Sequence, residues 1–263
     1  MEIKLVEDLA DFKACENIQK VVWGFSDLEI VSASNMIAVA HAGGMTAAAL
    51  NRGEVVGFVT AFASYLPRLD RPNGLHSHML AVLPDYRGKG VGRLLKWFQR
   101  DWCLERGLTW MTWTFDPLQA KNARLNLEHL GATVDTYRVN EYGELGGDLN
   151  TGLPTDRLVA FWALESQRTQ TLAQGRKLET HFLELIPAAL AANDGEPGEP
   201  QLKLKESKVS VALPENLNTL LKDEPKLALE WRFAVRKALM TYFECGYTIN
   251  RFAGDFYILE RQI

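Results

Sequence analysis

The feature that most constrains this chain is a glycine-rich segment, Arg87-Gly88-Lys89-Gly90-Val91-Gly92, between a strand-like and a helix-like stretch. Residues 75–83 alternate and then run apolar, as a central strand does. After the glycines, apolar side chains recur every three or four residues up to Trp102, and Gly107 stands where a C-terminal helix cap belongs. Such a loop presents backbone N–H groups at the positive end of a helix, which favours phosphate binding.

The loop also carries the basic residues Arg87, Lys89 and Arg93, although the formal net charge of the chain is -4. It does not fit the P-loop, in which serine or threonine follows the lysine, because Gly90 follows Lys89. It does not fit the dinucleotide-binding pattern either, because Arg93 stands where the third glycine is required. From these residues alone, a surface turn without a ligand remains an alternative.

The surrounding patterns predict an α/β (α+β) domain with a mixed sheet flanked by helices. A turn at Asn51-Arg52-Gly53-Glu54 predicts a hairpin, because glycine tolerates positive φ. The expected elements are a helix at 11–23, strands at 45–50, 55–65 and 75–83, a helix from 91, a strand at 108–115, a helix at 119–130, and strands at 132–139 and 158–164.

Beyond about Glu165 the sequence changes character, and we expect two domains, residues 1–164 and a smaller α/β extension at 165–263. The extension should hold a polar helix, a loop at 193–200, a strand at 208–213, a long helix at 225–245 and a strand pair near 250–255. The long helix is too apolar for a solvated tail and should pack as a cap, with Arg232 or Arg236 facing a substrate. Residues 242–247 also loosely resemble residues 127–132.

Composition narrows the possible functions. The 47% of hydrophobic and 24% of charged residues are ordinary for a globular protein, and the pI of about 5.8 argues against nucleic acid as a partner. Cys15, Cys103 and Cys245 have neither disulfide nor zinc spacing, so we expect a reducing compartment and no metal. The acidic N-terminus does not resemble a secretory signal, and the apolar runs are too short to cross a membrane. We therefore expect a cytoplasmic protein.

With its context, Arg87-Gly88-Lys89-Gly90-Val91-Gly92 resembles the [Q/R]-x-x-G-x-G signature of the GNAT superfamily of N-acyltransferases. The strand before it resembles the fourth strand of that superfamily, and the helix after it resembles the third helix. The resemblance covers roughly residues 1–164. It implies the GNAT fold, whose mixed, mostly antiparallel sheet is splayed, and an acyl-coenzyme A such as acetyl-coenzyme A as co-substrate.

The resemblance also implies contacts with the coenzyme. Backbone amides from Gly88 to Arg93 should hold the pyrophosphate. Backbone groups on the strand should pair with the pantetheine arm, and the N–H of Leu80 should stabilise the oxyanion. The cofactor-binding candidates are Leu80, Ala81, Val82, Arg87, Gly88, Lys89, Gly90, Val91, Gly92, Arg93 and, two places from the family position, Asn122.

The catalytic candidates implied by the resemblance are His76, His78 and Leu80. An amine must lose a proton before it attacks, and a histidine titrates near neutrality, so His76 is the candidate base. Either histidine could instead be a hydrogen-bonding residue of the acceptor cavity. Where many relatives have a tyrosine that protonates the thiolate, this chain has Leu127, so that Tyr86, Tyr137 or Tyr142 substitutes or the thiolate leaves unaided.

The expected function is transfer of an acetyl or succinyl group from coenzyme A to the amine of a small molecule by direct attack in a ternary complex. Segments 113–118 and 154–158 are similar to a bacterial subgroup of predicted acetyltransferases, some relatives of which acylate or succinylate amino acids. Arg157 or Arg138 could bind a carboxylate, although a surface arginine without that role is an equal alternative. A non-catalytic module that senses acyl-coenzyme A or binds a protein is the alternative function. The acceptor, the acyl group and the oligomeric state, with a homodimer among the options, are not specified by the sequence.

Overall fold

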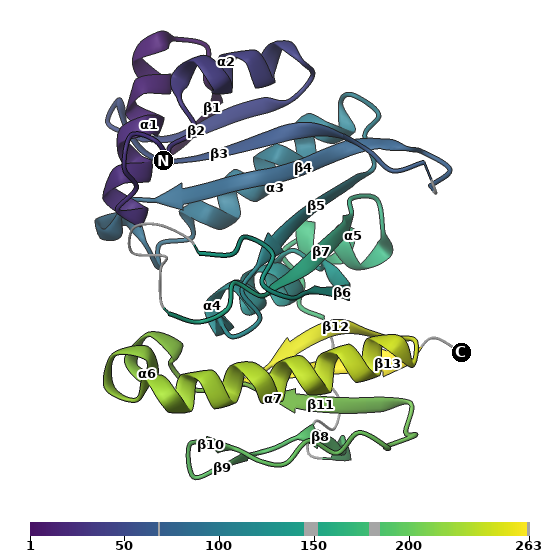
Figure 1. The fold of residues 1–263 in the computed structure, drawn as a ribbon. Coiled ribbons are helices and arrows are strands. Elements are labelled where there is room, and N and C mark those ends of the chain that lie inside the picture. Colours follow the sequence, from purple (N-terminus) through teal and green to yellow (C-terminus); the bar gives the residue numbers. More distant parts are fainter. Residues whose placement is uncertain (68, 145–151, 179–184, 262–263) are drawn as a thin grey trace. The chain divides into compact units, whose positions relative to one another are not determined.

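The computed structural model describes residues 1–67, 69–144, 152–178 and 185–261, and these residues form two compact units. The first, here called the N-terminal unit, contains residues 1–113 and 163–166. The second, the C-terminal unit, contains residues 114–144, 152–162 and 167–261. Each unit has a sheet and its own helices (Figure 1).

The sheet of the N-terminal unit has the strand order β1-β2-β3-β4-β5. Neighbouring strands are antiparallel except β4 and β5, which are parallel. Its strands are β1 (Glu2–Leu5), β2 (Met45–Asn51), β3 (Glu54–Tyr65), β4 (Asn73–Val82) and the first part of β5 (Trp110–Phe115). Its helices are α1 (Leu9–Trp23), α2 (Ala33–His41), the short 3-10 helix η1 (Pro84–Tyr86) and α3 (Val91–Leu104).

Helices cover both faces of this sheet. On one face α1 and α2 bury an apolar core with the strands, and Phe12, Met36 and Ala48 belong to that core. On the other face lies α3, whose Gln99 donates a hydrogen bond to Met45 Sδ and accepts one from Ser77 (Figure 1). Because side chains alternate along a strand, Met45 and Ala48 of β2 point to opposite faces. The two layers of helix therefore enclose β2, β3 and β4.

The sheet of the C-terminal unit has the strand order β7-β6-β12-β13-β11-β8. Only β8 and β11 are parallel among the strand pairs described for this sheet. The strands are β6 (Thr133–Arg138), β7 (Arg157–Ala163), β8 (Ala188–Leu190), β11 (Lys208–Ala212), β12 (Tyr247–Ala253) and β13 (Phe256–Arg261). The helices are α4 (Ala120–Ala123), the π-helical turn η2 (Arg124–His129), α5 (Gln167–Ala173), α6 (Leu217–Asp223) and α7 (Pro225–Glu244).

Helix α7 is the main cover of this second sheet, and Figure 1 shows it running along β11, β12 and β13. Its buried side chains include Trp231, Val235 and Leu239, whereas Phe233, expected to be buried, is 47% exposed. Trp231 is also fixed by a hydrogen bond from its indole N–H to the carbonyl of Gly195, at 3.0 Å. The helix therefore packs within its own unit. Its expected role as a cap on residues 1–164 stays a prediction.

The C-terminal unit contains an approximate internal repeat. A helix that ends at a glycine with φ of 80° leads into a strand twice, at Gly131 before β6 and at Gly246 before β12. The two strands pair antiparallel with each other at Val134 and Ile249, each three residues after its glycine. Pairing of equivalent residues in opposite directions is what a local two-fold axis produces. The weak sequence resemblance between residues 127–132 and 242–247 therefore reflects a structural repeat.

Most expected elements are present within a few residues of their predicted ends. The elements that were not expected include the short strands β1 and β8, the helices α2 and α6, and the 3-10 turn η1. One expectation was wrong, because part of the loop predicted at 193–200 is a small hairpin, β9 (Ala192–Asn193) and β10 (Glu196–Pro197). Its turn has Asp194 and Gly195 at positive φ, which explains why the composition indicated only a loop.

Candidate active site

The glycine loop lies in the N-terminal unit, between η1 and α3. Gly88 and Gly90 have φ of 73° and 79°, in the left-handed region where a side chain is strained. A Cβ at Gly88 would meet no atom within 4 Å, so that the backbone is open to an incoming group. The first described helical hydrogen bond of α3 runs from Leu94 N to Gly90 O, at 3.0 Å. The backbone amides before Leu94 are therefore not used by the first described helical hydrogen bond, and free amides at a helix N-terminus are suited to binding an anion.

The basic side chains of the loop are exposed: Arg87, Lys89 and Arg93. Arg87 Nε donates to the carbonyl of Val82 at 3.1 Å, and the ammonium of Lys89 lies 5.3 Å from the centre of the Tyr86 ring. Both cations therefore lie close to the C-terminal end of β4, which is Val82. This arrangement adds positive charge to the backbone donors, which suits a pyrophosphate.

Strand β4 has an open edge beyond its first few residues. It pairs with β3 from Asn73 to Val82, whereas its described parallel pairing with β5 is limited to Leu75 with Met111 and His76 with Thr112. Backbone groups of β4 after His76 thus face no paired β5 residue within the described part of the chain. A strand with such an edge can accept an extended ligand arm as an added strand. This is the geometry expected around Leu80 and Val82.

A β-bulge at His78 changes which way the rest of β4 faces. Ser77 pairs with Ala61 and Met79 with Thr60, so that His78 is the extra residue. Before the bulge Ser77 faces α3, but after it Ala81 lies in the core of α1 and α2. Leu80 faces α3 instead, where a Cβ on Gly92 would lie 3.3 Å from Leu80 Cδ2. The glycine at position 92 therefore permits close packing of the helix on the bulged strand.

The two histidines of β4 lie on one face. His76 Nδ1 is 3.1 Å from Thr112 Oγ1, and its cross-strand neighbour is Phe62. The ring of Phe62 also meets His78 edge-on at 5.0 Å between ring centres. Neighbouring atoms partly desolvate His78 and lower its pKa, although its side chain keeps exposed surface. The structure thus brings both base candidates together on the strand that leads to the glycine loop.

The three tyrosines that were candidates for the general acid do not all belong to the unit that contains the glycine loop. Leu127 is fully buried, so that this position belongs to the core of its unit. Tyr137 donates to Asp156 Oδ2 at 2.5 Å, and burial together with that carboxylate raises its pKa, which makes it a poor acid. Tyr142 is exposed and is hydrogen-bonded to Thr114 at 2.9 Å. Tyr86, which accepts a hydrogen bond from Asn51, is the candidate that lies in the same unit as the glycine loop.

Asn122, the weaker candidate for a coenzyme contact, is exposed on α4 in the C-terminal unit. Its amide donates to the carbonyl of Gln119 at 3.0 Å, within the first turn of that helix. Its side chain has no hydrogen bond described here that would orient it. The role of Asn122 stays a prediction.

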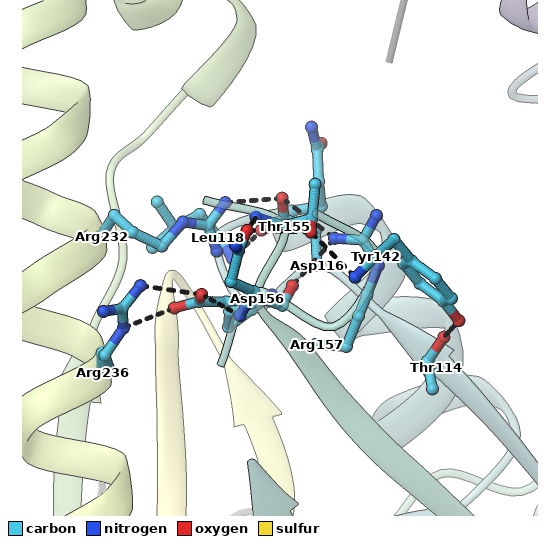
Figure 2. Close-up of polar contacts among 12 residues, drawn as sticks. Thr114, Asp116, Leu118, Tyr142, Thr155, Asp156, Arg157, Arg232 and Arg236 are labelled. Atoms are coloured by element: carbon cyan, nitrogen blue, oxygen red, sulfur yellow. Dashed lines mark hydrogen bonds and ion pairs between the residues drawn. The ribbon is translucent and has the colours of Figure 1, made fainter. Parts of the chain in front are cut away.

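The C-terminal unit contains an ionic cluster that the sequence indicated only in part. Asp156, which is 0% exposed, accepts two hydrogen bonds from Arg236, at 2.7 and 2.8 Å (Figure 2). Arg232 donates to Asp116 Oδ2 at 2.7 Å, and Arg157 Nη1 lies 3.9 Å from the same oxygen. The expected alternative, Arg138, instead pairs with Glu141 at the surface. Asp116 and Asp156 lie in the two segments, 113–118 and 154–158, that the sequence analysis compared with other proteins, but neither aspartate was given a role, because its arginine partners are distant in the sequence.

A second group missed by sequence reasoning is Lys96 on α3. Its side chain is buried, and its ammonium lies 3.7 Å above the centre of the Trp113 ring. Burial lowers its pKa to about 7, an effect that the neighbouring Cys103 opposes only weakly. A lysine in an amphipathic helix normally lies on the solvent side, so the burial of Lys96 was not predictable from the sequence pattern.

No group of histidine, cysteine, aspartate and glutamate side chains among the described residues could hold a metal ion. In the part of the chain that the structure describes, no helix is long and apolar enough to cross a membrane. The donor set of the loop is made of amides and basic side chains, which fits a phosphate-bearing coenzyme. Such residues do not form a metal centre.

The loop, the open strand and the adjacent histidines form the arrangement that the sequence resemblance led us to expect for an acyl-coenzyme A site. Residues 8–131 match the model of the acetyltransferase (GNAT) family. The family uses acetyl-coenzyme A as co-substrate. No curated protein matches the sequence.

Several solved structures are similar in fold. The ribosomal-protein-S18-alanine N-acetyltransferase from Escherichia coli is 19% identical over 63% of this chain and 94% of that chain, with a TM-score of 0.49. Aminoglycoside 6'-acetyltransferase type Ii is 16% identical over 64% and 99%, with a TM-score of 0.48. The protein yncA from Salmonella typhimurium, solved with its cofactor acetyl-CoA, is 22% identical over 64% and 95%, with a TM-score of 0.49.

Proposed function

We propose that the protein transfers an acetyl or succinyl group from coenzyme A to the amine of a small molecule, for which an amino acid is a candidate. The observation that carries this proposal is the sequence of open strand, glycine loop and helix N-terminus in one unit, β4 to α3. Such a run supplies an edge for the pantetheine arm and amides for the pyrophosphate. The amine attacks the thioester directly, with both substrates bound.

In this proposal the chain provides three things. The amides from Gly88 to Arg93 hold the pyrophosphate, and the N–H of Leu80 stabilises the oxyanion that forms as the amine attacks. His76 takes the proton of the amine, directly or through water. The contact of its Nδ1 with the hydroxyl of Thr112 orients the imidazole ring. The thiolate leaves either unaided or protonated by Tyr86.

An acyl-coenzyme A sensor without catalysis is the second candidate. It is favoured by one observation, the burial of Leu127 at the position where many relatives carry an acidic tyrosine. The histidines on the face of β4 support the enzyme instead, because a sensor has no use for a base. The two functions share the coenzyme loop.

The test is release of free thiol from acetyl-, propionyl- and succinyl-coenzyme A against a panel of amines. An enzyme releases thiol with at least one donor and acceptor, and the product carries the acyl group on nitrogen by mass spectrometry. Calorimetric binding of each donor without thiol release from any pair would replace the enzyme by the sensor. Donors that do not bind at all would remove both candidates.

We further propose that the protein acts in the cytoplasm. Its three cysteines are free, and burial raises the pKa of Cys15 and of Cys103 to about 12, which keeps these thiols protonated and unreactive. The acidic net charge supports a small-molecule partner rather than nucleic acid. Light scattering in solution would distinguish a monomer from a homodimer.

A further inference from the structure

We propose that the C-terminal unit holds a binding site for the carboxylate of a small molecule, formed by Arg232 and Arg157 on either side of Asp116. The site stands on contacts within this unit alone. Its assignment to a substrate of the acyl transfer rests on the proposed function. Figure 2 shows these residues together with Asp156 and Arg236.

The first argument is that two hydrogen-bond donor nitrogens of Arg232 have no acceptor among the described residues. Its side chain is 1% exposed, and one of its nitrogens, Nη2, donates to Asp116 Oδ2 at 2.7 Å. Its Nε and Nη1 are buried and have no hydrogen-bond partner among the described residues. Leaving buried guanidinium N–H groups unpaired is costly, and native structures rarely do so without a reason. An acceptor from outside the chain would provide the missing partner.

The second argument is charge. The cluster contains the positive side chains of Arg157, Arg232 and Arg236 against the negative ones of Asp116 and Asp156, three against two. The bidentate pair of Arg236 with Asp156 is complete in itself. One aspartate, Asp116, therefore serves two arginines, and one positive charge in a largely buried place is not balanced. A bound anion would balance it.

The third argument is that neither aspartate can supply the missing contacts. Asp116 Oδ1 already accepts from the amide of Leu118 at 2.8 Å, and its other oxygen faces the arginines. Both oxygens of Asp156 are used, by Arg236 and also by the hydroxyl of Tyr137 and the amide of Asn140. Neither aspartate therefore supplies the missing acceptor, and in this proposal a ligand carboxylate does. The planar fork of arginine matches a carboxylate with two parallel hydrogen bonds.

The cluster reaches solvent at Asp116 and, to a smaller extent, at Arg157. The side chain of Arg157 is 14% exposed and that of Asp116 is 23% exposed, whereas Arg232 lies deeper. Next to Arg157 stands Tyr142, whose ring centre is 5.2 Å from the guanidinium and whose hydroxyl is hydrogen-bonded to Thr114. In this proposal a carboxylate meets Arg157, on the more exposed side of the cluster, before it reaches Arg232.

Two sources of a carboxylate are compatible with the proposed reaction. An amino acid acceptor brings its own carboxylate, and a succinyl donor brings the far end of its acyl group. The chemistry of recognition is the same for both. The experiment therefore includes an arm for each source.

The binding arm uses the full-length protein and isothermal calorimetry with each standard amino acid and with succinate at millimolar concentration. At least one of these should bind, and its carboxamide, which has the same shape without the charge, should bind at least about tenfold more weakly. Arg157→Met should weaken binding by a similar factor. Arg138→Met is the matched control, because Arg138 pairs in register with Arg157 on the neighbouring strand but lies outside the cluster.

The result that overturns the site is absence of binding by every carboxylate tested, or equal binding to native protein and Arg157→Met. Should Arg157→Met unfold, as judged by circular dichroism, Arg232→Lys tests the same point. It keeps the charge beside Asp116 but removes the fork, and we expect a similar loss.

The activity arm assigns the source and separates this inference from the proposed function. In Arg157→Met, a higher KM for succinyl-coenzyme A alone assigns the donor, and a higher KM for the amino acid alone assigns the acceptor. Thiol release with amines that lack a carboxylate, together with no carboxylate binding, would defeat only the site. Carboxylate binding without thiol release from any donor would defeat only the proposed function.

Discussion

Asp156 is completely buried and forms a bidentate ion pair with Arg236 of α7. The Nε and Nη2 of Arg236 each donate to one carboxylate oxygen of Asp156. The two residues are eighty positions apart in the sequence, and both belong to the C-terminal unit. This pair joins the end of the loop before β7 to the middle of the long helix. It is a charge-assisted pair with two hydrogen bonds, at 2.7 and 2.8 Å.

Replacing Arg236 with methionine should destabilise the protein by about 3–5 kcal/mol, because it leaves the buried charge of Asp156 without its ionic partner. Lys237→Met is the control, since Lys237 is exposed and its pair with exposed Glu199 should contribute at most about 1 kcal/mol. The measurement is urea unfolding of both variants. Equal midpoints for the two would contradict a structural role for the pair.

Gly90→Val should weaken binding of coenzyme A about tenfold or more, because a branched side chain at φ of 79° distorts the loop and blocks approach to its amides. Gly107→Val is a matched control, since Gly107 has φ of 71° at the other end of α3 and a Cβ there meets no atom within 4 Å. Calorimetry measures both affinities. A folded Gly90→Val with unchanged affinity would remove the loop from the donor site.

His76→Gln should lower turnover by about a hundredfold or more and remove one inflection from its pH profile, with little change in donor affinity. Glutamine retains the ability to hydrogen-bond to Thr112 but cannot accept the proton. The same substitution at His41, which is exposed at the end of α2, serves as the control. Full activity of His76→Gln would end its assignment as base, and loss of the inflection in His78→Gln instead would transfer the role.

Ending the chain after Leu164 should give an aggregating product. Within the C-terminal unit such a deletion removes α7 and β12, which uncovers β6 and leaves Asp116 and Asp156 without Arg232 and Arg236. Size-exclusion chromatography and thiol release are the measurements. A soluble and fully active product would refute the idea that residues 165–263 are an integral part, and a soluble inactive one would favour their contribution to substrate binding.

Lys96 should make stability rise with pH. Its pKa is lowered to about 7 in the folded chain from an ordinary value of 10.5, so the unfolded chain binds more protons between these values. The free energy of unfolding should therefore increase from pH 7 toward pH 10, by up to a few kcal/mol, and should not change through this group below pH 7. Lys96→Met should lack this rise, whereas Lys121→Met, at an exposed position, should keep it. Identical pH dependence in both variants would contradict the assignment.

Local features were predictable from the sequence, and features that depend on distant residues were not. The glycine loop was found because strand, glycines and helix are consecutive, and the positive φ of Gly88 and Gly90 follows from their lack of a side chain. The bulge at His78 was not predictable, because a one-residue shift is set by the pairing of β3 with β4 rather than by either strand alone.

The ionic cluster is the clearest example of a feature that could not be predicted from the sequence. Arg232 and Arg236 were singled out as residues of an apolar helix, but their partners, Asp116 and Asp156, come from other segments. The division of the chain at residue 164 stays a prediction. The burial of Lys96 was not predicted, because it depends on contact with Trp113 of a strand, which the helix sequence does not show.

One outer strand of each sheet is short, and this has a consequence for self-association. β1 of the N-terminal unit has four residues, and β8 of the C-terminal unit has three. Short edges offer few free N–H and C=O groups to a strand from another molecule, so they protect against fibril-like growth. A dimer of this protein, if it forms, should therefore be held by side chains on helix surfaces, and it should dissociate without loss of strand content in circular dichroism.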